Sequence, residues 1–94
     1  MLLNDLQTRV FTYQKAGDVL RLSVLRFLLA ALKNKEIELR VSGGVITDEV
    51  VKKVIEKQIK QHNDSIESYK KGNRQDLVDK ETSELRILEE FLAL

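Results

Sequence analysis

Cysteine, proline and tryptophan are all missing from this sequence of 94 residues, and histidine occurs once. The missing cysteines exclude disulfide bonds, thiolate nucleophiles and thiolate metal sites. With no proline and only four glycines, little interrupts long helices. The longest apolar run, residues 27–32, is six residues long, far short of the roughly 18 that a membrane span needs. We therefore expect a helical domain with no membrane association.

The first residues, MLLNDLQTRV, carry Asp5 and lack the basic start of a secretory signal. A cytoplasmic setting is the resulting expectation.

Charge is nearly balanced, with a net value of +1, but it is unevenly distributed. Residues 1–73 hold 13 basic and 9 acidic side chains, a net charge of +4, whereas residues 74–94 hold 3 and 6, a net charge of −3. This pattern indicates a mildly basic body with an acidic end, and argues against a strongly electrostatic binder.

Apolar spacing predicts an all-α fold, a small bundle of four helices around a central helix at about residues 19–39. In that segment Leu22, Leu25, Leu29 and Leu32 recur at steps of 3, 4 and 3. Neighbouring apolar residues widen the stripe so far that several partners must cover it. The other helices are expected from about Leu3 or Asp5 to Ala16, from after Thr47 to before Gly72, and from about Arg74 onward. Their N-caps are expected at Asn4, Thr47 and Asn73, and that of the central helix at Asp18.

Residues 40–47, RVSGGVIT, have no helical period. They form either a loop or a short β-hairpin whose type I′ turn is Gly43-Gly44. The loop is the simpler interpretation, because an isolated two-stranded hairpin is only marginally stable. The glycine pair lacks the spacing of a nucleotide-binding loop.

Few side chains offer catalytic or metal chemistry. His62 falls on an apolar stripe between Ile59 and Ile66, and the positions three and four residues away provide no further metal ligand. We interpret it as a histidine at the edge of the core. Glu81 and Glu84 share a helical face, which is typical of a solvated acidic surface. The sequence therefore predicts no catalytic residue, no metal site and no cofactor.

Basic side chains are the candidates for contact with phosphate, namely Arg26, Lys33, Lys53, Lys57, Lys60 and Arg74. Lys53, Lys57 and Lys60 share one helical face. A solvated basic surface is the alternative interpretation. No aromatic residue is interleaved with these side chains, so stacking on single-stranded bases is not expected.

A series of short segments, in order along nearly the whole chain, carries a family resemblance: Ala16-Gly17-Asp18, Arg21–Arg26, Leu29–Asn34, Glu36-Ile37-Glu38, Thr47–Val50, Lys60-Gln61, Asp64-Ser65-Ile66, Tyr69, Gly72, Arg74, Asp76-Leu77, Glu81, Glu84 and Leu88. Together they resemble the GatB/YqeY domain family. The chain departs from the family pattern at His62-Asn63, where members often carry basic residues, and at Phe91-Leu92-Ala93, where many read Tyr-Leu-Pro.

The resemblance implies that residues 1–94 are an N-terminal helical subdomain, with the second, C-terminal subdomain of the family absent. In the family, a similar domain is the tail of the B subunit of the tRNA-dependent amidotransferase, a carbon–nitrogen ligase that uses glutamine as amide donor. The implied function is a non-catalytic module that assists amidation or aminoacylation by weak tRNA binding. Its implied partners are tRNA and subunits of the amidotransferase or of an aminoacyl-tRNA synthetase. Catalysis by this chain on its own is not implied.

The alternative is a protein–protein interaction or structural module that does not bind nucleic acid. The apolar end of the chain, Phe91–Leu94, is the surface that would support self-association.

Overall fold

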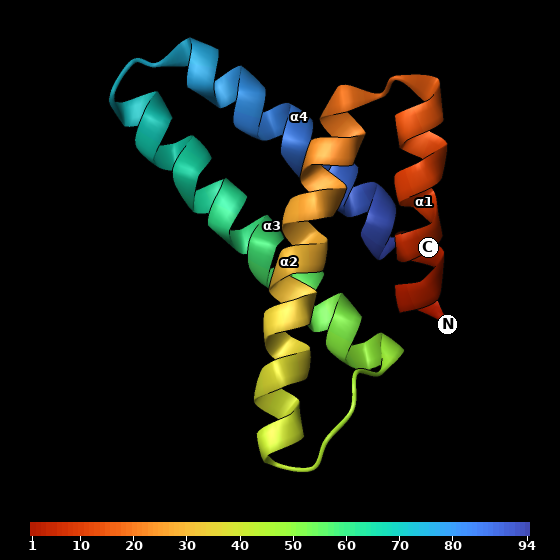
Figure 1. The fold of residues 1–94 in the computed structure, drawn as a ribbon. Helices are drawn as coiled ribbons and strands as arrows, with labels where there is room; N and C mark the ends of the chain where they lie inside the picture. The colour runs from red at the N-terminus through yellow and green to blue at the C-terminus, as the bar shows by residue number, and fades with distance from the viewer.

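The computed structural model describes residues 1–94 as four α-helices without strands (Figure 1). They are α1 (Leu2–Ala16), α2 (Val19–Val41), α3 (Asp48–Lys71) and α4 (Gln75–Leu92). Helix α2 contacts the other three helices, although the most extensive contact joins α3 and α4. The predicted all-α bundle with a central helix is confirmed, and that helix ends at Val41 rather than Leu39.

None of the four helices combines the length and the apolar character needed to cross a membrane.

The core lies where α2 crosses the other helices (Figure 1). Every helix contributes buried apolar side chains to it: Leu2 and Leu6, then Val24, Leu25, Leu28 and Leu32, then Val51 and Ile55, and last Ile87, Leu88 and Phe91. Phe91 is 1% exposed, and its ring stacks on Tyr13 with centroids 6.4 Å apart. The apolar end of the chain is therefore held in the bundle by Phe91, while Leu94 stays partly exposed.

The molecule is elongated, with extents of 45 × 33 × 20 Å and a radius of gyration of 14.4 Å. A compact domain of this length has a radius of gyration of about 12.4 Å. The C-terminal half of α2 and the far end of the α3–α4 hairpin both extend beyond the core (Figure 1). This open shape leaves hollows between α2 and α3.

Short turns set the directions of the helices. Gly17 ends α1 in the left-handed region at φ 69°, and the Asp18 carboxylate accepts a hydrogen bond from Arg21 N–H at 3.1 Å. Residues 42–47 form a loop and not a hairpin, and Thr47 Oγ1 accepts from Val50 N–H at 3.2 Å. The predicted caps at Asp18 and Thr47 are confirmed.

Two other predicted caps are wrong. Asn73 adopts the left-handed conformation, at φ 56°, that turns the chain between α3 and α4, so Arg74 takes the N-cap position instead. Asn4 lies inside α1, which begins at Leu2. There the Leu2 N–H donates to Asp48 Oδ1 at 3.0 Å, so a side chain from α3 satisfies the start of α1.

One ion cluster joins α2 to α4. Arg21 donates from Nε and Nη2 to the two carboxylate oxygens of Glu90, at 3.0 and 2.6 Å, and from Nη1 to Asp18 at 3.0 Å. The side-chain hydrogen bonds lower the pKa of Glu90 and raise that of Arg21. The pKa of Asp18 is lowered first by the Arg21 backbone N–H and then by the Arg21 side chain. Arg21 thus pairs α2 with the acidic α4.

Replacing Asp48 tests the contact between α3 and the start of α1. Asp48→Ala should lower the free energy of unfolding by about 1 kcal/mol, the usual cost of a lost cap. Urea unfolding followed by circular dichroism measures it. Glu49→Ala is the matched control, because Glu49 also lies in the first turn of α3 but caps no helix. Equal losses in the two variants would contradict the cap.

Glu90→Gln tests the cluster through its pH dependence. The ion pair of Glu90 contributes about 0.2–1 kcal/mol to the free energy of unfolding, as is usual for a partly exposed pair. Because the pKa of Glu90 is lowered, this contribution is complete above the ordinary glutamate pKa of about 4.3. It is lost as the pH falls through the lowered pKa of the folded state. Melting temperatures of both proteins from neutral to acidic pH should therefore converge only below about pH 4. Glu89→Gln, which breaks no ion pair, should melt like the wild type throughout.

Candidate functional site

Two neighbouring hollows share Phe27, Gln58 and Gln61. One is lined by α2, α3 and α4, and the other by α2 and α3. The first, the histidine cavity, has a volume of about 280 Å³ and is lined by Ser23, Val24, Phe27, Gln58, Gln61, His62, Ser65, Glu81 and Glu84. The second, the basic groove, has a volume of about 630 Å³ and is lined by Phe27, Ala31, Asn34, Lys35, Glu38, Leu39, Val50, Lys53, Val54, Lys57, Gln58 and Gln61.

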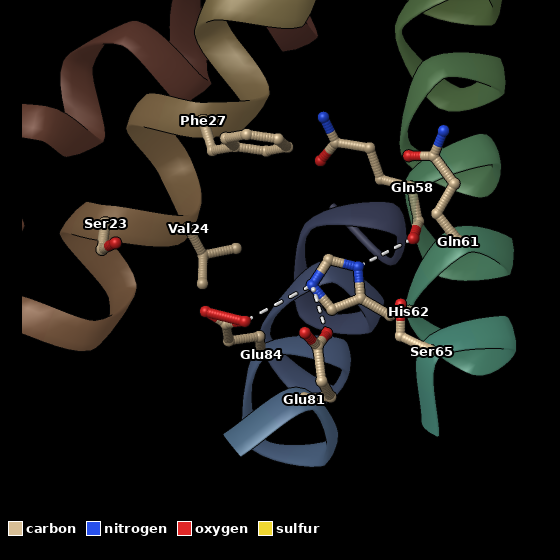
Figure 2. Close-up of a pocket in the computed structure, with 9 residues that line it drawn as sticks. All are labelled: Ser23, Val24, Phe27, Gln58, Gln61, His62, Ser65, Glu81 and Glu84. Atoms are coloured by element: carbon tan, nitrogen blue, oxygen red, sulfur yellow. Dashed lines mark hydrogen bonds and ion pairs between the residues drawn. The ribbon is translucent and has the colours of Figure 1, made fainter. Parts of the chain in front are cut away.

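In the histidine cavity, His62 of α3 faces Glu81 and Glu84 of α4 (Figure 2). Its Nε2 atom lies 3.4 Å from Glu81 Oε2 and 3.6 Å from Glu84 Oε1. All three side chains are largely withdrawn from solvent, with exposed fractions of 17%, 19% and 18%. Ligand atoms of the three lie within 4.8 Å of one another, so this set could hold a metal ion.

The α3–α4 hairpin brings these residues together. His62 and Glu84 each lie eleven residues from Asn73, at the turn, so the antiparallel helices place them at the same level. Glu81 is three residues before Glu84 and shares its face. The symmetry about the turn is the sequence signal that could have found this cluster. A search confined to positions three and four residues from His62 misses it.

The core-edge position expected for His62 is confirmed, but the solvated surface expected for Glu81 and Glu84 is wrong. His62 does have acidic partners, and they come from the next helix. Glu81 and Glu84 are not a solvated acidic surface, because both turn toward the cavity (Figure 2). The exposed acidic side chains of α4 are instead residues such as Asp76 and Asp79.

The His62 ring is oriented by its own helix. Its Nδ1 lies 2.9 Å from the backbone carbonyl oxygen of Gln58. A carbonyl oxygen only accepts hydrogen bonds, so Nδ1 carries the hydrogen and donates it. In the neutral imidazole, Nε2 then has a lone pair directed at the two carboxylates. The residues that line the cavity include no lysine or arginine to balance them.

The basic groove holds two of the predicted phosphate contacts. Lys53 and Lys57 project from α3 and form no ion pair, whereas Lys35 of α2 is bonded to Glu38 at 3.3 Å. Phe27, 66% exposed, lines the same groove. An aromatic side chain therefore lies beside the basic residues in space, although none is interleaved with them in the sequence. Phe27 is distant from Lys53 and Lys57 in sequence, and the packing of α2 beside α3 brings them to one groove.

The other predicted phosphate contacts lie elsewhere. Arg26 and Lys33 are exposed, and their spacing of seven residues places both on the side of α2 that faces away from the core. Lys60 shares the α3 face of Lys53 and Lys57, but its ammonium lies 3.5 Å from Asp64.

Arg74 lies at the turn between α3 and α4, away from the groove. It bonds Asp76 at 3.2 Å, which raises the pKa of Arg74 and lowers that of Asp76. Of the predicted contacts, the structure therefore assembles only Lys53 and Lys57 in a hollow, with Lys60 beside them.

With the fold and the hollows described, similarity to known proteins identifies the family. The sequence model of the family described as Yqey-like protein matches residues 3–93. The chain belongs to this family, and the GatB/YqeY resemblance is confirmed.

Curated relatives share one name, "Altered inheritance of mitochondria protein 41, mitochondrial". The relative from Lachancea thermotolerans is 40% identical over 77 residues, covering 82% of this chain and 40% of the relative. The one from Kluyveromyces lactis is 40% identical over 76 residues, covering 81% and 40%. The one from Saccharomyces cerevisiae is 36% identical over 78 residues, covering 82% and 40%. The chain thus spans about two fifths of the length of these relatives.

These names contradict the cytoplasmic setting expected from the sequence, because the relatives are named as mitochondrial proteins. The expectation rests only on the lack of secretory and membrane signals, and neither signal separates the cytoplasm from the mitochondrion.

Proposed function

We propose that this domain is a non-catalytic module that assists tRNA-dependent amidation or aminoacylation by binding tRNA weakly through the basic groove. The observation that carries the proposal is the groove itself, where two lysines without acidic partners flank an exposed aromatic ring. The GatB/YqeY resemblance supports tRNA as the ligand. The names of the relatives support a mitochondrial setting.

The side chains of the basic groove suit an unpaired segment of RNA. The ammonium groups of Lys53 and Lys57 can neutralise phosphates, and each such contact releases counterions from the RNA. The exposed ring of Phe27 offers a face on which a base can stack without regard to its sequence. Two phosphate contacts and one stacked base make a weak, sequence-tolerant interaction, which is what a helper of a larger enzyme requires.

Charge reversal tests which basic residues make the contact. Lys53→Glu/Lys57→Glu should weaken tRNA binding strongly and reduce the salt slope of log K by about 1.4–1.8, since each lost contact accounts for about 0.7–0.9. Arg26→Glu/Lys33→Glu is the matched control, because it changes the net charge equally but alters the outer side of α2. Fluorescence anisotropy with labelled tRNA at several salt concentrations measures both.

Equal losses of tRNA affinity in the two double variants would mean that net charge alone governs binding. That result would contradict binding in the basic groove. If the wild type shows no tRNA binding even at low salt, the RNA function is wrong. The protein-interaction alternative would then remain, with the exposed side chains of Phe27, Ile37 and Val41 on α2 as its surface.

Phe27→Ala tests the stacking contact. Loss of one stacked base costs about 1–3 kcal/mol, so tRNA affinity should fall by roughly 5- to 150-fold while the salt slope stays unchanged. Phe11→Ala is the matched control, because Phe11 is 71% exposed on α1 and lines neither hollow. Retention of full affinity by Phe27→Ala in the same anisotropy assay would contradict a stacking role.

A further inference from the structure

The histidine cavity brings two carboxylates to one ring nitrogen. Glu81 and Glu84 face His62 Nε2, and neither carboxylate forms an ion pair with a lysine or arginine. The hydrogen bond from Nδ1 to the Gln58 carbonyl keeps the Nε2 atom directed at them. When Nε2 carries no proton, three electron-rich atoms converge in a partly buried site, and they repel one another unless a cation lies between them.

The spacing of these atoms fits a tetrahedral metal ion. Nitrogen and oxygen ligands lie about 2.0–2.2 Å from Zn²⁺, which places two ligands of a tetrahedron about 3.3–3.6 Å apart. The distances from His62 Nε2 to the two carboxylates are 3.4 and 3.6 Å. One imidazole with two carboxylates favours a divalent transition ion over Mg²⁺, which prefers six oxygen ligands.

Gln58 lines the same cavity on the side of Phe27. The residue is only 4% exposed and lines the cavity, yet its side-chain oxygen Oε1 has no hydrogen-bond partner. Figure 2 shows the amide reaching from α3 toward Phe27 at the cavity wall. A buried acceptor without a donor is costly, so the Gln58 side chain is a strained feature of the wall beside Phe27.

The hydrogen bond behind the His62 ring also matches a metal centre. Metal-binding histidines usually donate their other ring N–H to a carbonyl or carboxylate, which fixes the tautomer and the ring plane. The Gln58 carbonyl has this role toward His62. The backbone oxygen of Gln58 thus orients the ring, while its side chain lies beside Phe27 (Figure 2).

We propose that His62, Glu81 and Glu84 bind one divalent transition-metal ion, for which Zn²⁺ is the best fit. Three protein ligands leave a fourth position for water or another oxygen ligand from the cavity. The ion links α3 to α4 between the main core, which includes Ile55 and Ile87, and the separate buried side chains Ile66 and Val78. It therefore fixes the base of the hairpin arm that extends beyond the core.

Calorimetric titration of the whole chain with Zn²⁺ alone, in buffer freed of metal, tests the proposal. The wild type should bind one ion per chain. Glu81→Gln/Glu84→Gln should bind at least 100-fold more weakly, because losing ligands costs more than the 10- to 100-fold of a lost supporting contact. Glu67→Gln/Glu89→Gln, with the same charge change at exposed positions, should bind like the wild type.

Melting temperature provides a second readout. Zn²⁺ at about 100 times its Kd should raise the melting temperature of the wild type and the control by about 10 °C, because it binds the folded state. It should leave Glu81→Gln/Glu84→Gln unchanged. Without metal, that variant should show the helical circular dichroism spectrum of the wild type at the temperature of the titration, so weak binding cannot be ascribed to unfolding.

Three outcomes would overturn the site. They are the lack of saturable one-to-one Zn²⁺ binding by the wild type, equal binding by Glu81→Gln/Glu84→Gln, and Mg²⁺ binding as tight as that of Zn²⁺. If the wild type does not bind Zn²⁺, a proton on His62 Nε2 supplies the positive charge that faces the two carboxylates.

Discussion

The antiparallel packing of α3 against α4 is the contact on which the rest of the structure depends. The left-handed turn at Asn73 sets its register and so decides which side chains of the two helices meet. His62 meets Glu84 because both lie at the same distance from that turn. The same register directs Ile87, Leu88 and Phe91 into the main core and Glu90 toward Arg21. A shift of one residue would rotate α4 by about 100° and break all of these contacts together.

The hollows follow from how little core a chain of this size can build. The main core is confined to the crossing of α2 with the other helices, and beyond it the helices diverge (Figure 1). Where α2 and α3 separate, the facing side chains are polar or only partly buried, as Gln61 and Lys53 are. Two hollows with opposite charge therefore lie side by side, and Phe27 borders both.

Local sequence patterns predict the helices well, because spacing and caps within one helix are enough to define it. The central helix and the caps at Asp18 and Thr47 are of this kind. The caps expected at Asn4 and Asn73 fail for a different reason. The partner that satisfies α1 is Asp48, from a helix far along the chain, and Asn73 is used for its left-handed backbone.

The candidate sites depend almost wholly on contacts between helices. Of the basic residues proposed from the sequence, only Lys53 and Lys57 enter a hollow, and Phe27 joins them only because α2 lies beside α3. His62 looks isolated within its own helix, since its partners Glu81 and Glu84 lie beyond the turn. None of these contacts encodes the cellular location. The mitochondrial name of the relatives is what contradicts the expected cytoplasmic setting.

Charge links the two proposals. A phosphate bound in the basic groove would lie next to the cavity that holds Glu81 and Glu84, because the hollows share Phe27, Gln58 and Gln61. Two carboxylates withdrawn from solvent repel a neighbouring polyanion, and low local polarity strengthens that repulsion. A divalent ion in the cavity cancels their charge and removes this opposition. Metal binding and RNA binding would then favour each other, and by linkage each would strengthen the other by the same factor.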